Sequence, residues 1–75
     1  MKITVETGQW AARYVSERVV TIDMPGACTV EDVVASLNIP DDEAGMAILG
    51  GKAVPSGHSL NNGDSITLHP IIIGG

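Results

Sequence analysis

The chain has 75 residues, of which 44% are hydrophobic and 17% are charged, as expected for one small globular domain rather than a disordered segment. A domain of this length buries only about 60% of its unfolded surface, which leaves little room for a deep catalytic cleft. Nine acidic and four basic residues give a net charge of −5, which argues against nucleic-acid binding because phosphate contacts need clustered Lys and Arg. An acidic surface suits a basic partner, but it also serves solubility alone.

Two strands are expected in the first third of the chain. In the segment KITVET, residues 2–7, Ile3 and Val5 alternate with polar side chains, which is typical of a half-buried strand. Residues 18–24 are largely β-branched and favour a second strand, which the turn-forming pair Pro25-Gly26 ends.

The connection between these two strands, residues 8–17, has no single pattern. It holds the only aromatic side chains of the protein, Trp10 and Tyr14, at i and i+4. A helical turn would place both rings on one side. A wide hairpin would also accommodate them, and the sequence leaves both interpretations open.

Residues 29–39 are expected to form the main helix. Thr29 is a favourable N-cap, and Asp32 stands where a capping box needs an acidic side chain. Apolar residues recur at i, i+3, i+4 and i+7, which makes one apolar stripe along the helix. The stripe consists of Val30, Val33, Val34 and Leu37. Asn38 and Pro40 are expected to end the helix.

The last third of the chain predicts a hairpin and a final strand. Residues 46–54 favour two short extended pieces around a turn at residues 50–52, because paired glycines permit the positive φ of tight turns. Residues 55–64 indicate a turn-rich loop. Residues 65–69 alternate again and predict a strand that points two side chains inward, Ile66 and Leu68.

This order of elements predicts an α+β roll with a mixed sheet of four to five strands. The single main helix must bury its stripe on one face of that sheet, and the last strand is expected to return beside the first. The predicted inner face carries Ile3, Val5, Ile66 and Leu68. Residues 1–70 are expected to form the domain, and residues 71–75 a flexible C-terminal donor tail.

The tail combines residue types suited to docking and to reaction at a chain end. Pro70 lacks an N–H group and ends the pairing of the last strand. The five residues that follow reach roughly 16 Å if extended. Three isoleucines favour an extended chain that offers apolar side chains, and two glycines fit a narrow channel and leave a terminal carboxylate unshielded. The predicted partner-binding tail is Pro70, Ile71, Ile72, Ile73, Gly74 and Gly75.

The chemistry of such a terminus points to activation by another protein. A carboxylate is a poor acyl donor until it is joined to a leaving group such as AMP. Residues 49–54 contain two glycines and a lysine, but they lack the spacing of a P-loop. No nucleophile–base pair or carboxylate pair can be assembled, so the chain is expected to have no catalysis of its own. ATP is expected to be used by a partner enzyme, with no cofactor bound here.

Four stretches resemble the ThiS/MoaD family of ubiquitin-like sulfur-carrier proteins. They are TVEDVVASL (29–37), AILGGKAV (47–54), LNNGDSITLHP (60–70) and the terminal GG (74–75). The third stretch matches the family pattern L-x-x-G-D-x-I-x-L/F-x-P. The resemblance implies a β-grasp (ubiquitin-like) fold. It also implies that Gly75 is adenylated by a ubiquitin-activating-like adenylyltransferase and converted to a thiocarboxylate that donates sulfur.

The resemblance leaves the pathway and the acceptor open. It implies work with a molybdopterin-synthase large subunit or a thiazole synthase. The spacing from Gly51 to Asp64 slightly favours the molybdopterin (or tungstopterin) branch over the thiamine-thiazole branch. The main alternative is a prokaryotic ubiquitin-like modifier that is conjugated to other proteins through Gly75. A plain interaction domain with an incidental Gly-Gly end is a third reading.

Several other sites are not expected. Cys28 is the only cysteine, so neither an intrachain disulfide nor a thiolate zinc site can form. His58 and His69 lack metal-ligand spacing, and His58 is expected to be solvated. Residues 1–8 do not form a signal peptide, and no apolar run is long enough to span a membrane, so a cytoplasmic location is expected.

Overall fold

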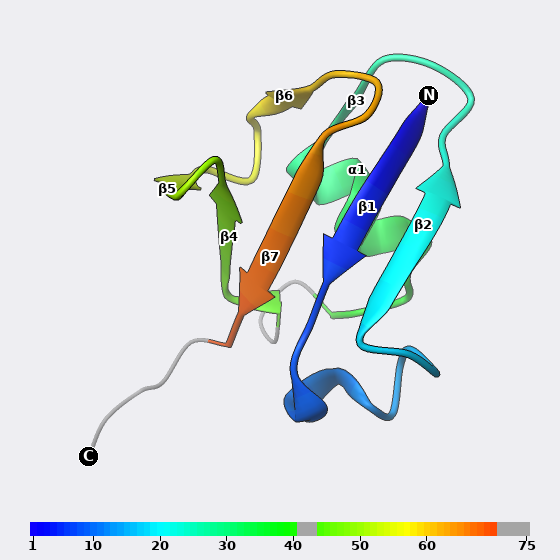
Figure 1. Cartoon of the computed structure of the whole chain (residues 1–75), viewed down its shortest axis with the longest axis vertical. Coiled ribbons are helices and arrows are strands. Elements are labelled where there is room, and N and C mark those ends of the chain that lie inside the picture. The colour runs from blue at the N-terminus through cyan, green and yellow to red at the C-terminus, as the bar shows by residue number, and fades with distance from the viewer. Residues whose placement is uncertain (41–43, 71–75) are drawn as a thin grey trace.

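The computed structural model describes residues 1–40 and 44–70 and shows one helix packed on one face of a mixed sheet (Figure 1). The strands are β1 (Lys2–Glu6), β2 (Val19–Asp23), β3 (Cys28–Thr29), β4 (Met46–Leu49), β5 (Lys52–Val54), β6 (Ser59–Leu60) and β7 (Ser65–His69). The helices are the short 3₁₀ helix η1 (Gln9–Ala11) and α1 (Val30–Ser36). The main sheet has five strands in the order β2-β1-β7-β4-β5, which confirms the predicted β-grasp roll.

The first and last strands, β1 and β7, are neighbours, as predicted, and the structure shows that they pair in parallel at the centre of this sheet. Val5 lies beside Ile66 in the register, and both side chains are fully buried at 0% exposure. All other neighbouring strands of the main sheet are antiparallel. The two central strands therefore come from opposite ends of the chain and fix where every other strand is added.

A turn immediately before β7 holds this parallel register in place. The side chain of Asn62 accepts the N–H of Lys2 at 2.7 Å, and the N–H of Gly63 donates to the carbonyl of Lys2 at 2.8 Å. The carbonyl of Asp64 accepts the N–H of Thr4 at 2.9 Å. The turn residues are thus bonded to the start of β1, so β7 begins at a defined position beside it.

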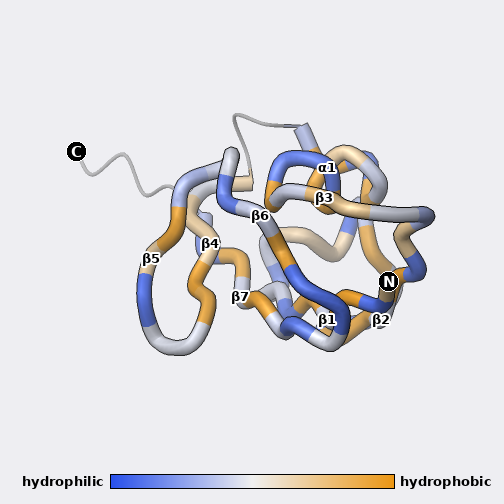
Figure 2. The backbone as a smooth tube through the Cα atoms, turned by 90° about the horizontal axis from the view of Figure 1, so that it is seen from above, coloured by the Kyte–Doolittle hydropathy of each residue, from blue (hydrophilic) through white to orange (hydrophobic). Residues whose placement is uncertain are grey.

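The core lies between α1 and the inner face of the sheet, and Figure 2 shows hydrophobic and hydrophilic residues alternating along the strands. Most of the predicted core residues are buried. They are Val30, Val33 and Val34 on the helix and Ile3, Val5, Ile66 and Leu68 on the strands. Leu37 is only half-buried, and Ile39 is buried beyond the end of the helix. The predicted helix stripe is therefore confirmed except at its last position.

The capping box at the start of α1 is present as predicted. The N–H of Asp32 donates to Oγ1 of Thr29 at 3.3 Å, and the N–H of Thr29 donates to Oδ2 of Asp32 at 2.9 Å. Two further N–H groups of the first turn reach the loop before β6. Val30 donates to the carbonyl of His58 and Glu31 donates to that of Ser56. All four bonds satisfy donors that a helix start leaves unpaired.

The end of α1 is earlier than the sequence predicts. The expected helix runs to residue 39, but regular helix stops at Ser36 because Asn38 adopts a left-handed φ of 61°. The N–H of Asn38 then donates to the carbonyl of Ala35, and that of Ile39 donates to the carbonyl of Val34. This pair of bonds is the Schellman arrangement, which closes the helix and turns Ile39 into the core.

The hairpin of β4 and β5 forms as predicted around its two glycines. Leu49 and Lys52 are the closing pair, and the two residues between them, Gly50 and Gly51, have φ values of 59° and 82°. Positive φ at both central positions is the requirement of a type I′ turn, whose twist matches that of the strands.

A second, two-stranded sheet was not predicted. Within the expected loop 55–64, β6 pairs with β3, and Leu60 enters the core at the position opposite Cys28. Two-residue strands are too short to show an alternating pattern. The pairing depends on where α1 and the main sheet place the two segments, which local sequence does not specify.

We expect Val34→Asp to unfold the domain or to lower its stability by about 4 kcal/mol or more, because the new carboxylate would be buried without a partner. Val34 is only 4% exposed. Ala35→Asp, on the exposed side of the same helix, is the matched control and should cost roughly 1 kcal/mol. Urea unfolding followed by circular dichroism measures both. Equal losses would mean that burial does not decide the result.

Gly51→Ala should destabilise the chain by roughly 1–2 kcal/mol, because a residue with a Cβ resists the left-handed backbone. The added methyl would meet nothing within 4 Å, so the φ of 82° is the only source of strain. Gly57→Ala is the control, since Gly57 is equally open and has no such φ. It should be neutral or slightly stabilising in the same urea titration. If Gly57→Ala costs as much as Gly51→Ala, turn strain is not the cause.

Candidate functional site

The candidate site begins where the chain leaves the sheet. β7 ends at His69, and Pro70, which has no N–H to donate, follows it as an exposed residue. Pro70 is the one predicted tail residue that the structure describes. The other five, Ile71, Ile72, Ile73, Gly74 and Gly75, lie outside the described residues, so the predicted flexibility and the division at residue 70 stay predictions.

An apolar strip lies on the outer face of the sheet beside this exit. Ile66 and Leu68 point inward, so the residues between and after them, Thr67 and His69, point outward. The register places Met46 opposite His69, Ile48 opposite Thr67 and Ala53 opposite Ile48. We call Met46, Ile48 and Ala53 the outer strip.

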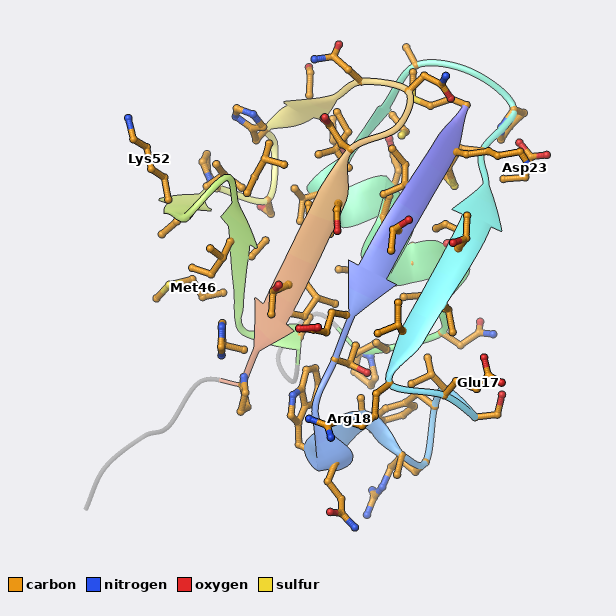
Figure 3. The ribbon with its side chains drawn as sticks, in the orientation of Figure 1. Glu17, Arg18, Asp23, Met46 and Lys52 are labelled. Carbon is orange, nitrogen blue, oxygen red and sulfur yellow. The ribbon has the colours of Figure 1, made fainter. Side chains whose placement is uncertain are left out.

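The outer strip presents its side chains to solvent. Met46 is 51% exposed, Ala53 is exposed and Ile48 is half-buried. In Figure 3, Met46 extends away from β4 close to the end of β7. An exposed large apolar side chain next to the chain exit is a suitable contact for a protein that binds the residues after Pro70.

The other half of the outer face is mostly polar. On β1 and β2 it carries Lys2, Thr4, Glu6, Thr21 and Asp23. Thr4 and Thr21 are hydrogen-bonded through their hydroxyl groups at 3.4 Å, and the N-terminal ammonium lies 3.6 Å from the carboxylate of Asp23. Val19, which is 51% exposed, is the exception at the far edge. The outer strip is thus the apolar surface next to the exit.

The sequence contains a weak signal for the outer strip, which sequence reasoning did not use. Met46 and Ile48 are two apart on one strand, so they share a face. Without the register there is no way to know that this face is outward and adjacent to His69. The hairpin was predicted, but its position in the sheet was not.

The described residues that carry reactive side chains are used structurally. The thiol of buried Cys28 donates to Sδ of Met1 at 3.6 Å. His58 is half-buried rather than fully solvated, and its carbonyl accepts a helix N–H. Across residues 1–40 and 44–70, no three His, Cys, Asp or Glu side chains gather into a metal-binding group. Nor does any helix in that part of the chain have the length and apolar character needed to cross a membrane.

Solved structures with this fold match nearly the whole chain. Small archaeal modifier protein 1 of Haloferax volcanii is 20% identical with a TM-score of 0.75, covering 95% of this chain and 98% of that chain. A candidate molybdopterin converting factor, subunit 1, from Pyrococcus furiosus is 14% identical with a TM-score of 0.76, covering 96% and 99%. A thiamine biosynthesis protein from Geobacter metallireducens is 18% identical with a TM-score of 0.59, covering 100% and 88%.

These structures confirm the fold that the resemblance to ubiquitin-like sulfur carriers implies. At such identities the likeness concerns the fold alone. Among curated proteins, no sequence matches this chain. A family model does match it over residues 4–73, from the first strand into the predicted tail. Because that match covers most of its length, the chain belongs to the Mut7-C ubiquitin family.

Proposed function

We propose that this protein is a sulfur carrier whose Gly75 carboxylate is adenylated by a partner enzyme and converted to a thiocarboxylate. The observation that carries the proposal is the geometry of the exit. β7 is a central strand, its last residue pairs with the exposed Met46, and the predicted donor tail continues directly from that point. A partner that holds the outer strip would therefore also receive the tail.

The proposed reaction has two steps, both performed by partners. First, an oxygen of the Gly75 carboxylate attacks the α-phosphorus of ATP, and pyrophosphate leaves, which gives an acyl adenylate. Second, a reduced sulfur nucleophile attacks the acyl carbon, and AMP leaves with the C–O bond electrons. If the nucleophile is hydrosulfide, loss of its S–H proton leaves a C-terminal thiocarboxylate, in which one oxygen has been replaced by sulfur. If it is a persulfide, the first product is an acyl disulfide, and a thiol reductant must cleave its S–S bond to give the same thiocarboxylate. The chain supplies the terminus and its presentation.

Each part of the tail has a distinct role in this proposal. Pro70 has no N–H to continue strand pairing, which would leave the residues after it available to a partner. The three isoleucines, residues 71–73, supply apolar contacts to the partner, and alternate side chains would enter opposite walls of a groove. Gly74 and Gly75 have no side chain to obstruct the channel that leads to the reacting phosphorus. The likeness to a molybdopterin converting factor and to a thiamine biosynthesis protein supports such a role.

Cofactor biosynthesis is the proposed destination of the sulfur, with molybdopterin or tungstopterin ahead of the thiamine thiazole. The support is the spacing between Gly51 and Asp64, two residues that act as turn formers in the structure. The receiving partner would be a molybdopterin-synthase large subunit or, on the other branch, a thiazole synthase.

The second candidate function is conjugation to other proteins through Gly75. It is favoured by the likeness to a small archaeal modifier protein, which has the same fold over almost its full length. Both functions need the same adenylated terminus and differ only in the nucleophile that takes the acyl group. In the second case a lysine amine attacks and an amide bond forms.

We expect Gly75 to tolerate neither deletion nor extension. Removing Gly75, or adding one residue after it, moves the carboxylate by about 3.5 Å. An error of even 1 Å in a positioned transfer can cost about a hundredfold in rate. With the ubiquitin-activating-like enzyme of the same organism, ATP and a sulfur donor, the wild type should gain AMP and then exchange oxygen for sulfur, as intact mass shows. Both length variants should gain neither.

Gly75→Ala should also fail, because the methyl group would enter a channel with no room for it. Gly57→Ala is the matched control. It makes the same substitution at an exposed glycine outside the tail and should react like the wild type. All the tail variants should keep the wild-type unfolding midpoint. Full activation of the extended chain without prior trimming would rule out the Gly75 carboxylate as the reactive group.

The carrier and the modifier predict different products in cells. If the chain is a carrier, a tagged version should accumulate as a thiocarboxylate and show no ladder of higher-mass conjugates. If it is a modifier, denaturing gels should show covalent ladders that disappear when Gly75 is deleted. Mass spectrometry of the tagged protein and of any ladder separates the two.

A further inference from the structure

The connection between β1 and β2 is a folded loop beside the candidate site. Residues 7–18 make it longer than the roughly two to five residues of most hairpin loops. Its ends are joined by a hydrogen bond of 2.7 Å from the N–H of Thr7 to the carbonyl of Arg18. Ala11, in η1, is fully buried, and Trp10 packs against the core. The loop is therefore preformed, like the compact surface loops that often carry function.

This loop lines a half-open pocket of about 380 Å³, which we call the loop pocket. Its polar lining residues are Thr7, Gln9, Ser16, Glu17 and Arg18. The volume is enough for one polar side chain from another molecule. The mixture of hydroxyl, amide and charged groups is unlike the apolar outer strip and calls for a different ligand.

The loop pocket lies at the same end of the strands as the chain exit, beside the C-terminal ends of β1 and β7. The parallel register sets Glu6 beside Thr67, and continued by two residues it places Gly8 level with His69. Adjacent strands are about 4.8 Å apart, so the pocket begins roughly one strand away from Pro70. Figure 1 shows the end of β7 and the β1–β2 loop at the same end of the sheet. A protein that holds the tail would reach this pocket without covering the rest of the domain.

One accessible donor that lines the pocket, Arg18, has no ion-pair partner among the described residues. Thr7 is only 3% exposed, yet its Oγ1 has no hydrogen-bond partner. That oxygen has almost no accessible surface, so a ligand in the pocket would not reach it, and the group that the pocket offers to a ligand is the exposed guanidinium of Arg18. Arg18 forms no ion pair, since the one ion pair of the described residues joins the N-terminus and Asp23. A carboxylate is the natural partner of an exposed guanidinium.

Glu17 limits which anion the pocket can take. In Figure 3 the side chains of Glu17 and Arg18 point in different directions, and no ion pair joins them. A ligand with a single negative charge can approach Arg18 from its side of the pocket. A doubly charged phosphate would meet stronger repulsion from Glu17, so the lining favours a carboxylate over a phosphate.

We propose that the loop pocket is a socket for a carboxylate side chain, an Asp or a Glu, of the enzyme that adenylates the C-terminal tail. The proposal rests on the proposed function, because it assigns the occupant to the partner that uses the adjacent terminus. It gives that partner two contacts of different chemistry, the apolar outer strip and the polar loop pocket. Arg18 attracts the carboxylate, and Glu17 repels doubly charged anions such as phosphate more strongly than singly charged ones.

The first experiment tests the pocket without any enzyme. The wild-type chain, labelled with nitrogen-15, is titrated to the solubility limit with N-acetyl-glutamate N-methylamide and, separately, with its uncharged glutamine analogue. The glutamate probe should shift the amide signals of Thr7, Gly8 and Arg18, and the glutamine probe should not. Equal shifts with both probes, or none with the glutamate probe, would overturn the proposal.

Adjacent charge variants give a test of sign. Arg18→Gln should abolish the response to the glutamate probe, whereas Glu17→Gln should strengthen it, because a repelling charge is lost. Arg13→Gln removes the same charge from a loop residue that does not line the pocket, and it should respond like the wild type. Unchanged binding in Arg18→Gln, or the same loss in Arg13→Gln, would show that general charge and not the pocket is responsible.

The second experiment measures adenylation of these variants by the enzyme. Arg18→Gln should raise the KM for the carrier about tenfold and leave kcat unchanged, because a charge-assisted contact is lost while the tail is intact. Glu17→Gln should lower KM. A KM unaffected by Arg18→Gln would overturn the assignment to this enzyme. If the wild-type chain itself is not adenylated, the proposed function fails, and the occupant assigned to the pocket fails with it, whereas the probe titrations still decide whether the pocket binds a carboxylate.

Discussion

The parallel pairing of β1 with β7 is the contact on which the rest of the structure depends. It joins segments from opposite ends of the chain and sets Val5 beside Ile66 under the helix. Every other strand of the main sheet adds to the outside of this pair. Pairing of such distant segments has an entropic cost of loop closure. The hydrogen bonds from the turn at residues 61–64 to the start of β1 help to offset that cost. In the folded chain the turn holds β7 in one register against β1.

The same pairing also decides how the functional surfaces are arranged. Because the two strands are parallel, the loop that follows β1 begins at the same end of the sheet at which β7 ends. On one side of the exit lies the outer strip, and on the other lies the loop pocket. An antiparallel arrangement would have placed the loop at the opposite end. The topology thus gathers an apolar contact, a polar cavity and the proposed reactive terminus within the reach of one partner.

The predicted division between domain and tail would suit a protein that is modified by other enzymes. The core is built mainly from aliphatic residues in two layers, the thiol of Cys28 is bonded within it, and the backbone carbonyl of His58 caps α1. A terminus beyond the last strand can be altered chemically without disturbing that core. In the proposed function the domain would contribute recognition, whereas a partner would contribute ATP binding and the exclusion of water.

The sequence by itself determined the elements whose causes are local. The capping box of Thr29, the paired glycines of the β4–β5 hairpin and the alternation in β1 and β7 each depend on neighbours a few residues away. Only the tertiary structure decided the β3–β6 pair, the end of α1 before residue 39, the outer strip and the loop pocket. The β3–β6 pair and the outer strip depend on which distant segments lie side by side, which a pattern within one segment does not specify. The helix end and the loop pocket depend on the backbone conformation at Asn38 and within residues 7–18, which the residue types there permit but do not dictate.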